Sequence, residues 1–377
     1  MDEMRIGIIG FGFMGKAHTY GYRTMPLYYE NLPFRIKPAG VCTRKLETAL
    51  KAKEDFDFEF ATDNPEDIFL RDDINVINIC TPNSCHKSSI IRAIQAGKNI
   101  YCEKPLTTSF ADAADVLKTL ENSSITTQIA FQNRFFPATM RAKEIIQEDK
   151  IGKVLSFRAC YLHSGSVDPN KPMGWKQDKK TGGGGVLLDL GSHVLDLVYH
   201  LIGPFDSLIA KKSIIYGSRP DIEGKIIPVE AEDSVLLIVK MKNGSMGTIE
   251  ASKASTGMND EFRVEIHGDK GALRFNLMDP NWLEYYDNSL PDAPLGGLKG
   301  FTRIECIQRF NKPGGSFPSS KLSIGWIRAH VHSLYSFLCC VHERKHANPS
   351  FRDGAYIQYI MEKAYESDST DSWVTID

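Results

Sequence analysis

The sequence lacks the features that mark several classes of protein. The net charge is only −2, from 45 basic and 47 acidic residues, so no positive field favours nucleic acid or an anionic membrane as a partner. The eight cysteines include no C-x-x-C pair, so the spacing indicates neither a zinc ribbon nor a thioredoxin-like site, and we expect no metal. No apolar run reaches the ~18 residues of a membrane-spanning helix. The sequence has no internal repeat, and its only low-complexity patch is 182–185.

We also expect no signal peptide. The apolar start has no long hydrophobic region and no small-residue cleavage site, and it is typical of a first strand. Scattered cysteines are typical of a reduced, intracellular protein, so we expect a cytoplasmic location. With 377 residues, 42% of them hydrophobic, the chain is long enough for about two domains with sizeable cores.

What the sequence does contain is a glycine-rich turn at its very start. The apolar run 5–9 ends at Gly10, Gly12 and Gly15, in the pattern G-x-G-x-x-G. Gly10 would allow a tight turn, Gly12 the approach of a pyrophosphate, and Gly15 the close packing of the next helix, whose N-terminus attracts phosphate. A glycine-rich turn without a ligand is the alternative. The strand before the motif and the helical pattern after it favour a dinucleotide site.

Strand-like and helical segments alternate through the first 131 residues. This alternation predicts an α/β fold with a doubly wound parallel sheet. The strands are expected at 5–9, 34–42, 75–80, 100–102 and 126–131. Ligands bind such sheets at the carboxyl ends of the strands, and Gly12, Thr43, Thr81 and Lys104 all fall there.

The tip of the second strand bears on the choice of cofactor. NAD-preferring sites usually carry Asp or Glu there, but this sequence has Thr43 and Arg44. A hydroxyl and a guanidinium suit a 2′-phosphate, so we expect NAD or NADP, with NADP slightly favoured. Alternatively, Arg44 simply begins the next helix in solvent.

Glu103, Lys104 and Pro105 follow the strand at 100–102. At a strand end in a nucleotide-binding sheet, the lysine can reach the crevice where the nicotinamide lies, and the proline fixes the backbone. The alternative interpretation is a solvated, charged turn.

The alternation ends after residue 131. A crossover at 132–137, a helix at 138–148 and a strand at 154–162 are expected, followed by an irregular segment at 164–180. So long a loop inside a compact chain indicates a functional role. Trp175 within it belongs either to the site or to the core.

Asp189 and His193 follow the glycines at 182–185. At i and i+4 on a helix they share one face, about 6 Å apart along the axis. Because burying such groups unpaired is costly, they either pair with each other or serve a site. The glycines allow another backbone or a ligand to come close, which favours the site. Asp196 repeats the spacing less clearly.

From residue 205 onward the pattern is β. Strands are expected at 207–216, 231–241, 245–255, 261–268 and 271–275, in an antiparallel or mixed sheet. A Gly/Pro-rich loop at 288–322 and helices at 324–343 and 356–367 complete the chain. We therefore predict a Rossmann domain at 1–131 and a second α+β domain, for substrate binding and oligomerisation, at 132–377.

Four motifs in this order resemble those of one family. They are G-F-G-F-M-G at 10–15 with His18 beyond it, T-P-N-x-x-H at 81–86, E-K-P at 103–105, and G-G-G-x-x-x-D-x-G-x-H at 183–193. On these motifs the chain resembles the glucose-fructose oxidoreductase and inositol dehydrogenase (Gfo/Idh/MocA) family over nearly its whole length.

The resemblance implies a Rossmann domain followed by a domain with a large, mostly antiparallel open sheet that often mediates oligomerisation, so we expect a homodimer or homotetramer. It implies hydride transfer between NAD(P) and a ring carbinol or ketone carbon of a sugar, sugar derivative or cyclic polyol. Two alternatives stay open: a non-catalytic dinucleotide or sugar sensor, and an NAD-dependent glycosidase.

The resemblance also implies roles for individual residues. Lys104, Asp189 and His193 would be the catalytic set. We expect these three residues, and Trp175 of the irregular loop, to bind substrate. His193 would be the general acid/base. By the same resemblance, a second set would surround the cofactor: Gly10, Phe11, Gly12, Phe13, Met14, Gly15, Cys80, Thr81, Pro82, Asn83, His86, Glu103, Gln132 and Asn133. We expect Lys104, and Thr43 and Arg44 at the tip of the second strand, to contact the cofactor as well.

Overall fold

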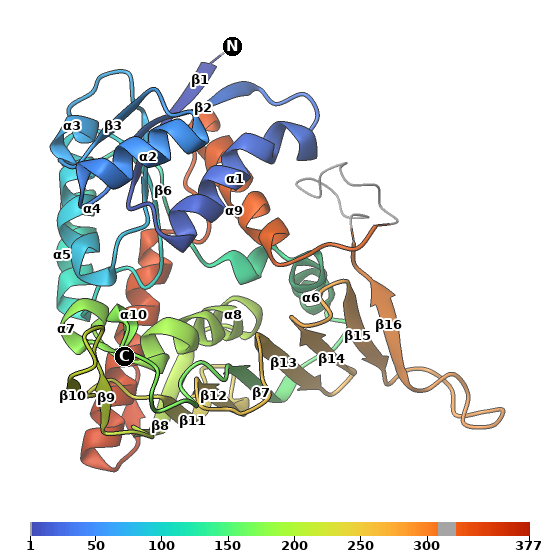
Figure 1. The fold of residues 1–377 in the computed structure, drawn as a ribbon. Helices are drawn as coiled ribbons and strands as arrows, with labels where there is room; N and C mark the ends of the chain where they lie inside the picture. The colour runs from blue at the N-terminus through green and yellow to red at the C-terminus, as the bar shows by residue number, and fades with distance from the viewer. Residues whose placement is uncertain (1, 308–321) are drawn as a thin grey trace. The chain divides into compact units, whose positions relative to one another are not determined.

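The computed structural model of the protein describes residues 2–307 and 322–377. These residues form two compact units (Figure 1). The first unit contains 2–132 and Ile327–Gln358, and the second contains 133–307, 322–326 and Tyr359–Asp377.

The first unit is built on a six-stranded parallel sheet with the strand order β3-β2-β1-β4-β5-β6. Its strands are β1 (Asp2–Ile9), β2 (Phe34–Cys42), β3 (Phe60–Thr62), β4 (Val76–Ile79), β5 (Asn99–Cys102) and β6 (Thr127–Ile129). The connecting helices are α1 (Phe13–Tyr28), α2 (Leu46–Phe56), α3 (Glu66–Phe69), α4 (His86–Gln95) and α5 (Phe110–Leu120). This is the order of a dinucleotide-binding fold, and it confirms the predicted doubly wound sheet.

A helix from late in the sequence completes this unit. α9 (Ile327–Glu343) packs on α1, and its Val331, Leu334 and Phe337 are fully buried. The expected division at 131/132 did not include this return of the chain. Its physical cause is the apolar face of α9, which is buried against α1 of the first unit.

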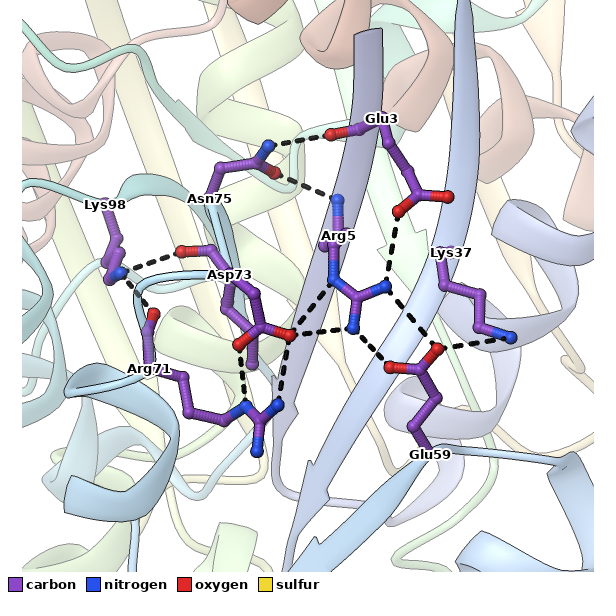
Figure 2. A network of polar contacts seen from close by, with 9 residues as sticks. Glu3, Arg5, Lys37, Glu59, Arg71, Asp73, Asn75 and Lys98 are labelled. Atoms are coloured by element: carbon purple, nitrogen blue, oxygen red, sulfur yellow. Dashed lines mark hydrogen bonds and ion pairs between the residues drawn. The ribbon is translucent and has the colours of Figure 1, made fainter.

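A network of charged side chains lies at the amino end of the parallel sheet (Figure 2). Arg5 of β1 pairs with Glu3, with Glu59 just before β3, and with Asp73 just before β4. The buried Lys98, just before β5, donates to the carbonyl oxygens of Arg71 and Ile74 at 2.7 and 2.8 Å. These ion pairs occupy the amino end of the sheet, whereas the predicted site residues lie at the carboxyl ends of the strands.

The second unit contains a nine-stranded sheet in the order β16-β15-β14-β13-β7-β12-β11-β8-β17. Its strands are β7 (Val154–Leu162), β8 (Phe205–Ser213), β11 (Ser234–Met241), β12 (Met246–Ser252), β13 (Glu261–Gly268), β14 (Gly271–Asn276), β15 (Trp282–Asp287), β16 (Phe301–Glu305) and β17 (Val374–Thr375). All neighbours in this order are antiparallel except β7 and β12, which confirms the mostly antiparallel open sheet. Ser218–Pro220 (β9) and Ile226–Pro228 (β10) form a separate small hairpin.

Helices cover one face of this sheet. α6 (Pro137–Gln147) packs on β14 and β15, and α8 (Ser192–Ile202) packs on β7 and β12 (Figure 1). α10 (Phe351–Thr370) begins in the first unit and ends in the second. Among the described residues, one helical segment, Lys179–Ile202, has the length and composition to cross a membrane, but 78% of its apolar window is buried inside the protein. Such burial is typical of a core helix.

The predicted loop at 288–322 is wrong in one part. Residues Phe301–Glu305 form β16, which pairs with β15, itself a strand that the sequence analysis did not predict. Five alternating residues after a Gly/Pro-rich stretch are too short to show a clear β period, so the pairing partner decides their structure. Residues 308–321 of that loop lie outside the described part of the chain.

Candidate active site

The glycine turn after β1 has the geometry of a dinucleotide cradle. Gly10 has φ +92°, and a side chain there would collide with the backbone of Cys80 at the end of β4. A side chain at Gly15 would collide with the carbonyl oxygen of Gly10, whereas one at Gly12 would meet nothing within 4 Å. The three glycines therefore serve a tight turn, open space beside the backbone, and close packing of the helix.

The N-terminus of α1 lies at this open space. Gly12 is its N-cap, no side chain caps the helix, and its first turn carries no acidic residue. Backbone N–H groups and the positive end of the helix dipole therefore face the position of a phosphate. The residues present fit a bound dinucleotide. Phe13, which follows Gly12, is 74% exposed.

The other predicted cofactor residues lie at neighbouring strand ends of the first unit. Thr43 directly follows β2, and its hydroxyl donates to the carbonyl oxygen of Lys45 at 2.8 Å, while Arg44 is exposed. Thr81 follows β4, and its buried hydroxyl oxygen has no hydrogen-bond partner among the residues that the structure describes. A polar atom buried in this way is costly unless a ligand or water meets it, which supports the predicted contact.

His86 ties two of these strand ends together. Its Nδ1 lies 2.9 Å from the carbonyl oxygen of Pro105, and its Nε2 lies 3.0 Å from that of Thr81. Burial lowers the pKa of His86, against the effect of these carbonyls. In the structure, His86 thus aligns the T-P-N turn with the E-K-P turn, and its contact with a cofactor stays a prediction.

Glu103 and Lys104 follow β5, as the sequence predicted. The buried Glu103 carboxylate lies 3.1 Å from Nε2 of His18 and accepts from the backbone N–H of Lys104 at 3.3 Å. On the other side of the ring, Nδ1 of His18 lies 3.1 Å from Oδ1 of Asn78. Since both ring nitrogens face acceptors, His18 is held as an imidazolium. Its partner Glu103 directly precedes the half-buried Lys104 in the chain.

Electrostatics agree with this assignment. Burial opposes the charge on His18, but contacts with Cys80 and Glu103 outweigh it and raise the pKa of His18 to about 10. Burial would raise the pKa of Glu103, but His18, Lys104 and His330 outweigh that effect and lower it. The E-K-P turn is therefore not a solvated surface turn.

Asn133, at the beginning of the second unit, is buried, and neither atom of its side-chain amide is hydrogen-bonded within the described part of the chain. The neighbouring Gln132 is also buried. An unsatisfied buried amide suits a ligand that offers both an acceptor and a donor, as a carboxamide does. The predicted role of both residues at the cofactor stays a prediction.

In the second unit, Asp189 lies in a π-helical turn at Leu187–Gly191, and His193 lies at the start of α8. The N–H of Ser192 donates to the carbonyl oxygen of Leu187, five residues back. The expected regular α-helix is therefore wrong for this turn. π-turns inside helices occur frequently at functional sites, where the wider turn changes the direction of side chains.

Asp189 lies between two lysines. Its Oδ1 lies 2.7 Å from Nζ of Lys176, and its Oδ2 lies 2.9 Å from Nζ of Lys253. Asp189 and Lys253 are both largely buried, with side chains 12% exposed. This arrangement pairs the carboxylate with two ammonium groups, and its oxygens can also accept hydrogen bonds from hydroxyl groups.

His193 is buried beside the aromatic ring of Tyr161, with ring centroids 5.9 Å apart. The hydroxyl of Tyr161 donates to Oδ1 of Asp260 at 2.7 Å, and Nε2 of His163 lies 2.8 Å from the same oxygen. Burial, with Asp260 and Asp189 nearby, raises the pKa of Tyr161 far above its ordinary value. Tyr161 therefore stays protonated beside the imidazole.

Two further residues of this region have clear positions. Asp196 forms a buried, two-oxygen ion pair with Arg134, with Nε 3.1 and 3.0 Å from the two carboxylate oxygens, so it stabilises the core. Trp175 is 41% exposed in a short 3₁₀-turn next to Lys176, which excludes the core position. Its contact with a substrate stays a prediction.

The sequence analysis missed Tyr161, His163 and Lys253. The last two directly follow β7 and β12, the one parallel pair in the sheet of the second unit as described. Because the carboxyl ends of parallel strands meet at one edge, this pairing brings His163 and Lys253 to the same end. In the first half of the sequence, residues at the carboxyl ends of parallel strands were selected as candidates. The same rule would have selected His163 and Lys253, but the sequence does not show that β7 and β12 are parallel.

Comparisons with known proteins define the class. A family model described as "Oxidoreductase family, NAD-binding Rossmann fold" matches residues 4–131, and one described as "GFO/IDH/MocA C-terminal domain" matches residues 139–274. The chain belongs to the Gfo/Idh/MocA family and is an NAD-binding oxidoreductase. The predicted family and class of enzyme are thereby confirmed.

Individual relatives agree over the full length or most of it. Levoglucosan dehydrogenase of Pseudarthrobacter phenanthrenivorans is 32% identical, covering 100% of this chain and 99% of its own. Its solved structure with NADH and levoglucosan has a TM-score of 0.96, with 100% of both chains covered. Myo-inositol 2-dehydrogenase of Thermotoga maritima is 23% identical over 72% of this chain and 74% of its own.

The imidazolium of His18 makes stability depend on pH. The group binds its proton more tightly in the folded chain, so its contribution is complete below a pH of about 6.5 and is lost as pH rises toward about 10. We expect the midpoint of urea unfolding to fall over this range in the wild type. In His18→Gln the fall should be smaller, and in the exposed control His346→Gln it should match the wild type. Equal slopes in all three proteins would contradict the assignment.

Proposed function

We propose that this oxidoreductase transfers a hydride between NAD and a ring carbinol carbon of a sugar, sugar derivative or cyclic polyol. One observation carries the proposal: Asp189, held between two lysines, lies four residues before the buried His193. Alternating charged acceptors and donors suit the adjacent hydroxyl groups of a sugar ring. The levoglucosan complex of the relative supports the same class of substrate.

His193, Asp189 and Lys104 each have a role that follows from the chemistry of the side chain. His193 takes the proton of the reacting hydroxyl in oxidation and returns it in reduction, which suits an imidazole with an ordinary pKa of about 6.5. Asp189 accepts a hydrogen bond from a neighbouring hydroxyl. Lys104, aligned through Glu103 and His18, donates to the reacting oxygen and stabilises its developing charge. NAD supplies the hydride chemistry when bound.

A kinetic test follows from the role of His193. The loss of a positioned proton-transfer group costs roughly 100–10,000-fold in kcat, so His193→Ala should lose most turnover and keep its Kd for NADH. Activity is read as nicotinamide absorbance in a screen of anhydrosugars, pyranoses and inositols, with both NAD and NADP. His346→Ala, an exposed histidine, is the control. Near-normal turnover by His193→Ala would reject the role, and no turnover by the wild type on any of these compounds would reject the substrate class.

The choice between the two cofactors is a separate proposal. Exposed Arg44 at the end of β2 favours NADP slightly, while solved complexes of the relative contain NADH. An arginine on a phosphate contributes about 1.5–3 kcal/mol, so Arg44→Ala should raise the KM for NADP about tenfold or more and leave the KM for NAD unchanged. Lys51→Ala, at an exposed position on α2, is the control. An unchanged KM for NADP would show that Arg44 does not read the 2′-phosphate.

We also propose that the open sheet forms a homodimer or homotetramer. Leu236 and Ile238 of β11 and Met246 of β12 lie on the face turned away from α8, and they are 56%, 45% and 50% exposed. Adjacent apolar side chains of this kind mark protein interfaces. Light scattering should give a multiple of 42.2 kDa, and Leu236→Arg combined with Ile238→Arg should give monomers. A monomeric wild type would contradict the proposal.

A cytoplasmic location is proposed on the state of the cysteines. All eight lie in the described part of the chain and are free thiols, which suits a reducing compartment. Recovery of the native protein in a membrane or secreted fraction of its source cells would contradict it.

A further inference from the structure

The glycines before the π-turn make room for protein groups. A side chain at Gly184 would collide with the hydroxyl of Tyr365, and one at Gly185 would collide with the backbone of Glu232. Of the two partners that the sequence analysis left open for these glycines, another backbone and a ligand, Gly185 meets the backbone.

Glu232 binds the first N–H groups of the helical segment that carries Asp189. Its carboxylate accepts from the N–H of Gly185 at 3.1 Å and from that of Leu187 at 3.0 Å. Its own carbonyl oxygen accepts from the N–H of Val186, between them, at 2.8 Å. Three consecutive N–H groups, which a helix cannot satisfy internally, are thus bound by one residue from another segment.

Tyr365 fixes this carboxylate in turn. Its hydroxyl donates to Oε1 of Glu232 at 2.9 Å. Burial, together with Glu232, raises the pKa of Tyr365 far above its ordinary value, so the hydroxyl stays a donor. Glu232 is itself buried, and a carboxylate at a helix N-terminus is stabilised by the helix dipole.

Glu232 anchors the helical segment at residues 185–187, and the position of this anchor determines which side chains it affects. Leu187, held by Glu232, begins the π-turn, Asp189 is two residues further along, and His193 is in the first turn of α8. A rotation or shift at Leu187 moves both side chains together. A misplacement of about 1 Å, even one caused by a residue far from the chemistry, can cost on the order of 100-fold in rate.

We propose that Glu232, fixed by Tyr365, is a positioning residue that sets the direction of Asp189 and His193. The inference rests on the proposed function of those two residues. Glu232 acts through the backbone of 185–187 and has no contact with substrate in this role.

The test compares Glu232→Gln with Tyr365→Phe. The amide of Gln offers one acceptor and turns an NH₂ toward the other N–H groups, so we expect kcat to fall about 10–100-fold with little change in the KM for sugar or the Kd for NADH. Tyr365→Phe removes one hydrogen bond, and we expect a fall of about three- to tenfold. Glu230→Gln, two residues away and exposed, should stay within about twofold of the wild type.

Hydrogen exchange separates this inference from the proposed function. The amides of Gly185 and Leu187 should exchange faster in Glu232→Gln than in the wild type, and equal exchange would overturn the anchor whether or not a substrate is known. Faster exchange with an unchanged kcat would overturn the positioning role. If Glu232→Gln does not fold, Tyr365→Phe decides by the same two measurements. A wild type without activity on any sugar or polyol overturns the proposed function, and with it the positioning role, while exchange still reports on the anchor.

Discussion

The direction of the parallel strands is the constraint on which the candidate site residues of each unit depend. Parallel strands end at the same edge of a sheet, so residues that are distant in sequence meet there. In the first unit this edge brings together the turns after β1, β2, β4 and β5, and ion pairs around Arg5 occupy the opposite end (Figure 2). In the second unit the single parallel pair, β7 and β12, brings His163 and Lys253 to one end by the same geometry.

Neighbouring side chains stabilise the charged groups among the candidate site residues. His18 lies between Asn78 and Glu103, and Glu103 in turn accepts from the backbone of Lys104. Asp189 lies between Lys176 and Lys253. In each case a buried or nearly buried charge is stabilised by neighbours at fixed positions, which also fix the direction of the group. In the first unit the stabilised group is a cation, His18, and in the second unit it is an anion, Asp189.

Much of the fold could be predicted from the sequence. The glycine pattern and the alternation of strands and helices gave the parallel sheet, and tight turns gave the mostly antiparallel second sheet. The predictions failed where contacts with other segments determine the local structure. β16 is too short to show a period of its own, and α9 joins the first unit because its apolar face packs on α1. The regular helix expected at Asp189 contains a π-turn, and the first residue of that turn, Leu187, donates its N–H to Glu232 of a distant segment.

The sequence by itself determined the family, the glycine turn, and the identity of Lys104, Asp189 and His193 as candidates, because these depend on local spacing and residue chemistry. Only the tertiary structure decided that Gly185 accommodates the backbone of Glu232, that Asp189 pairs with two lysines, and that Asp196 pairs with Arg134. Such pairings form between segments far apart in the chain, and their geometry follows from strand register and packing, which local sequence does not encode.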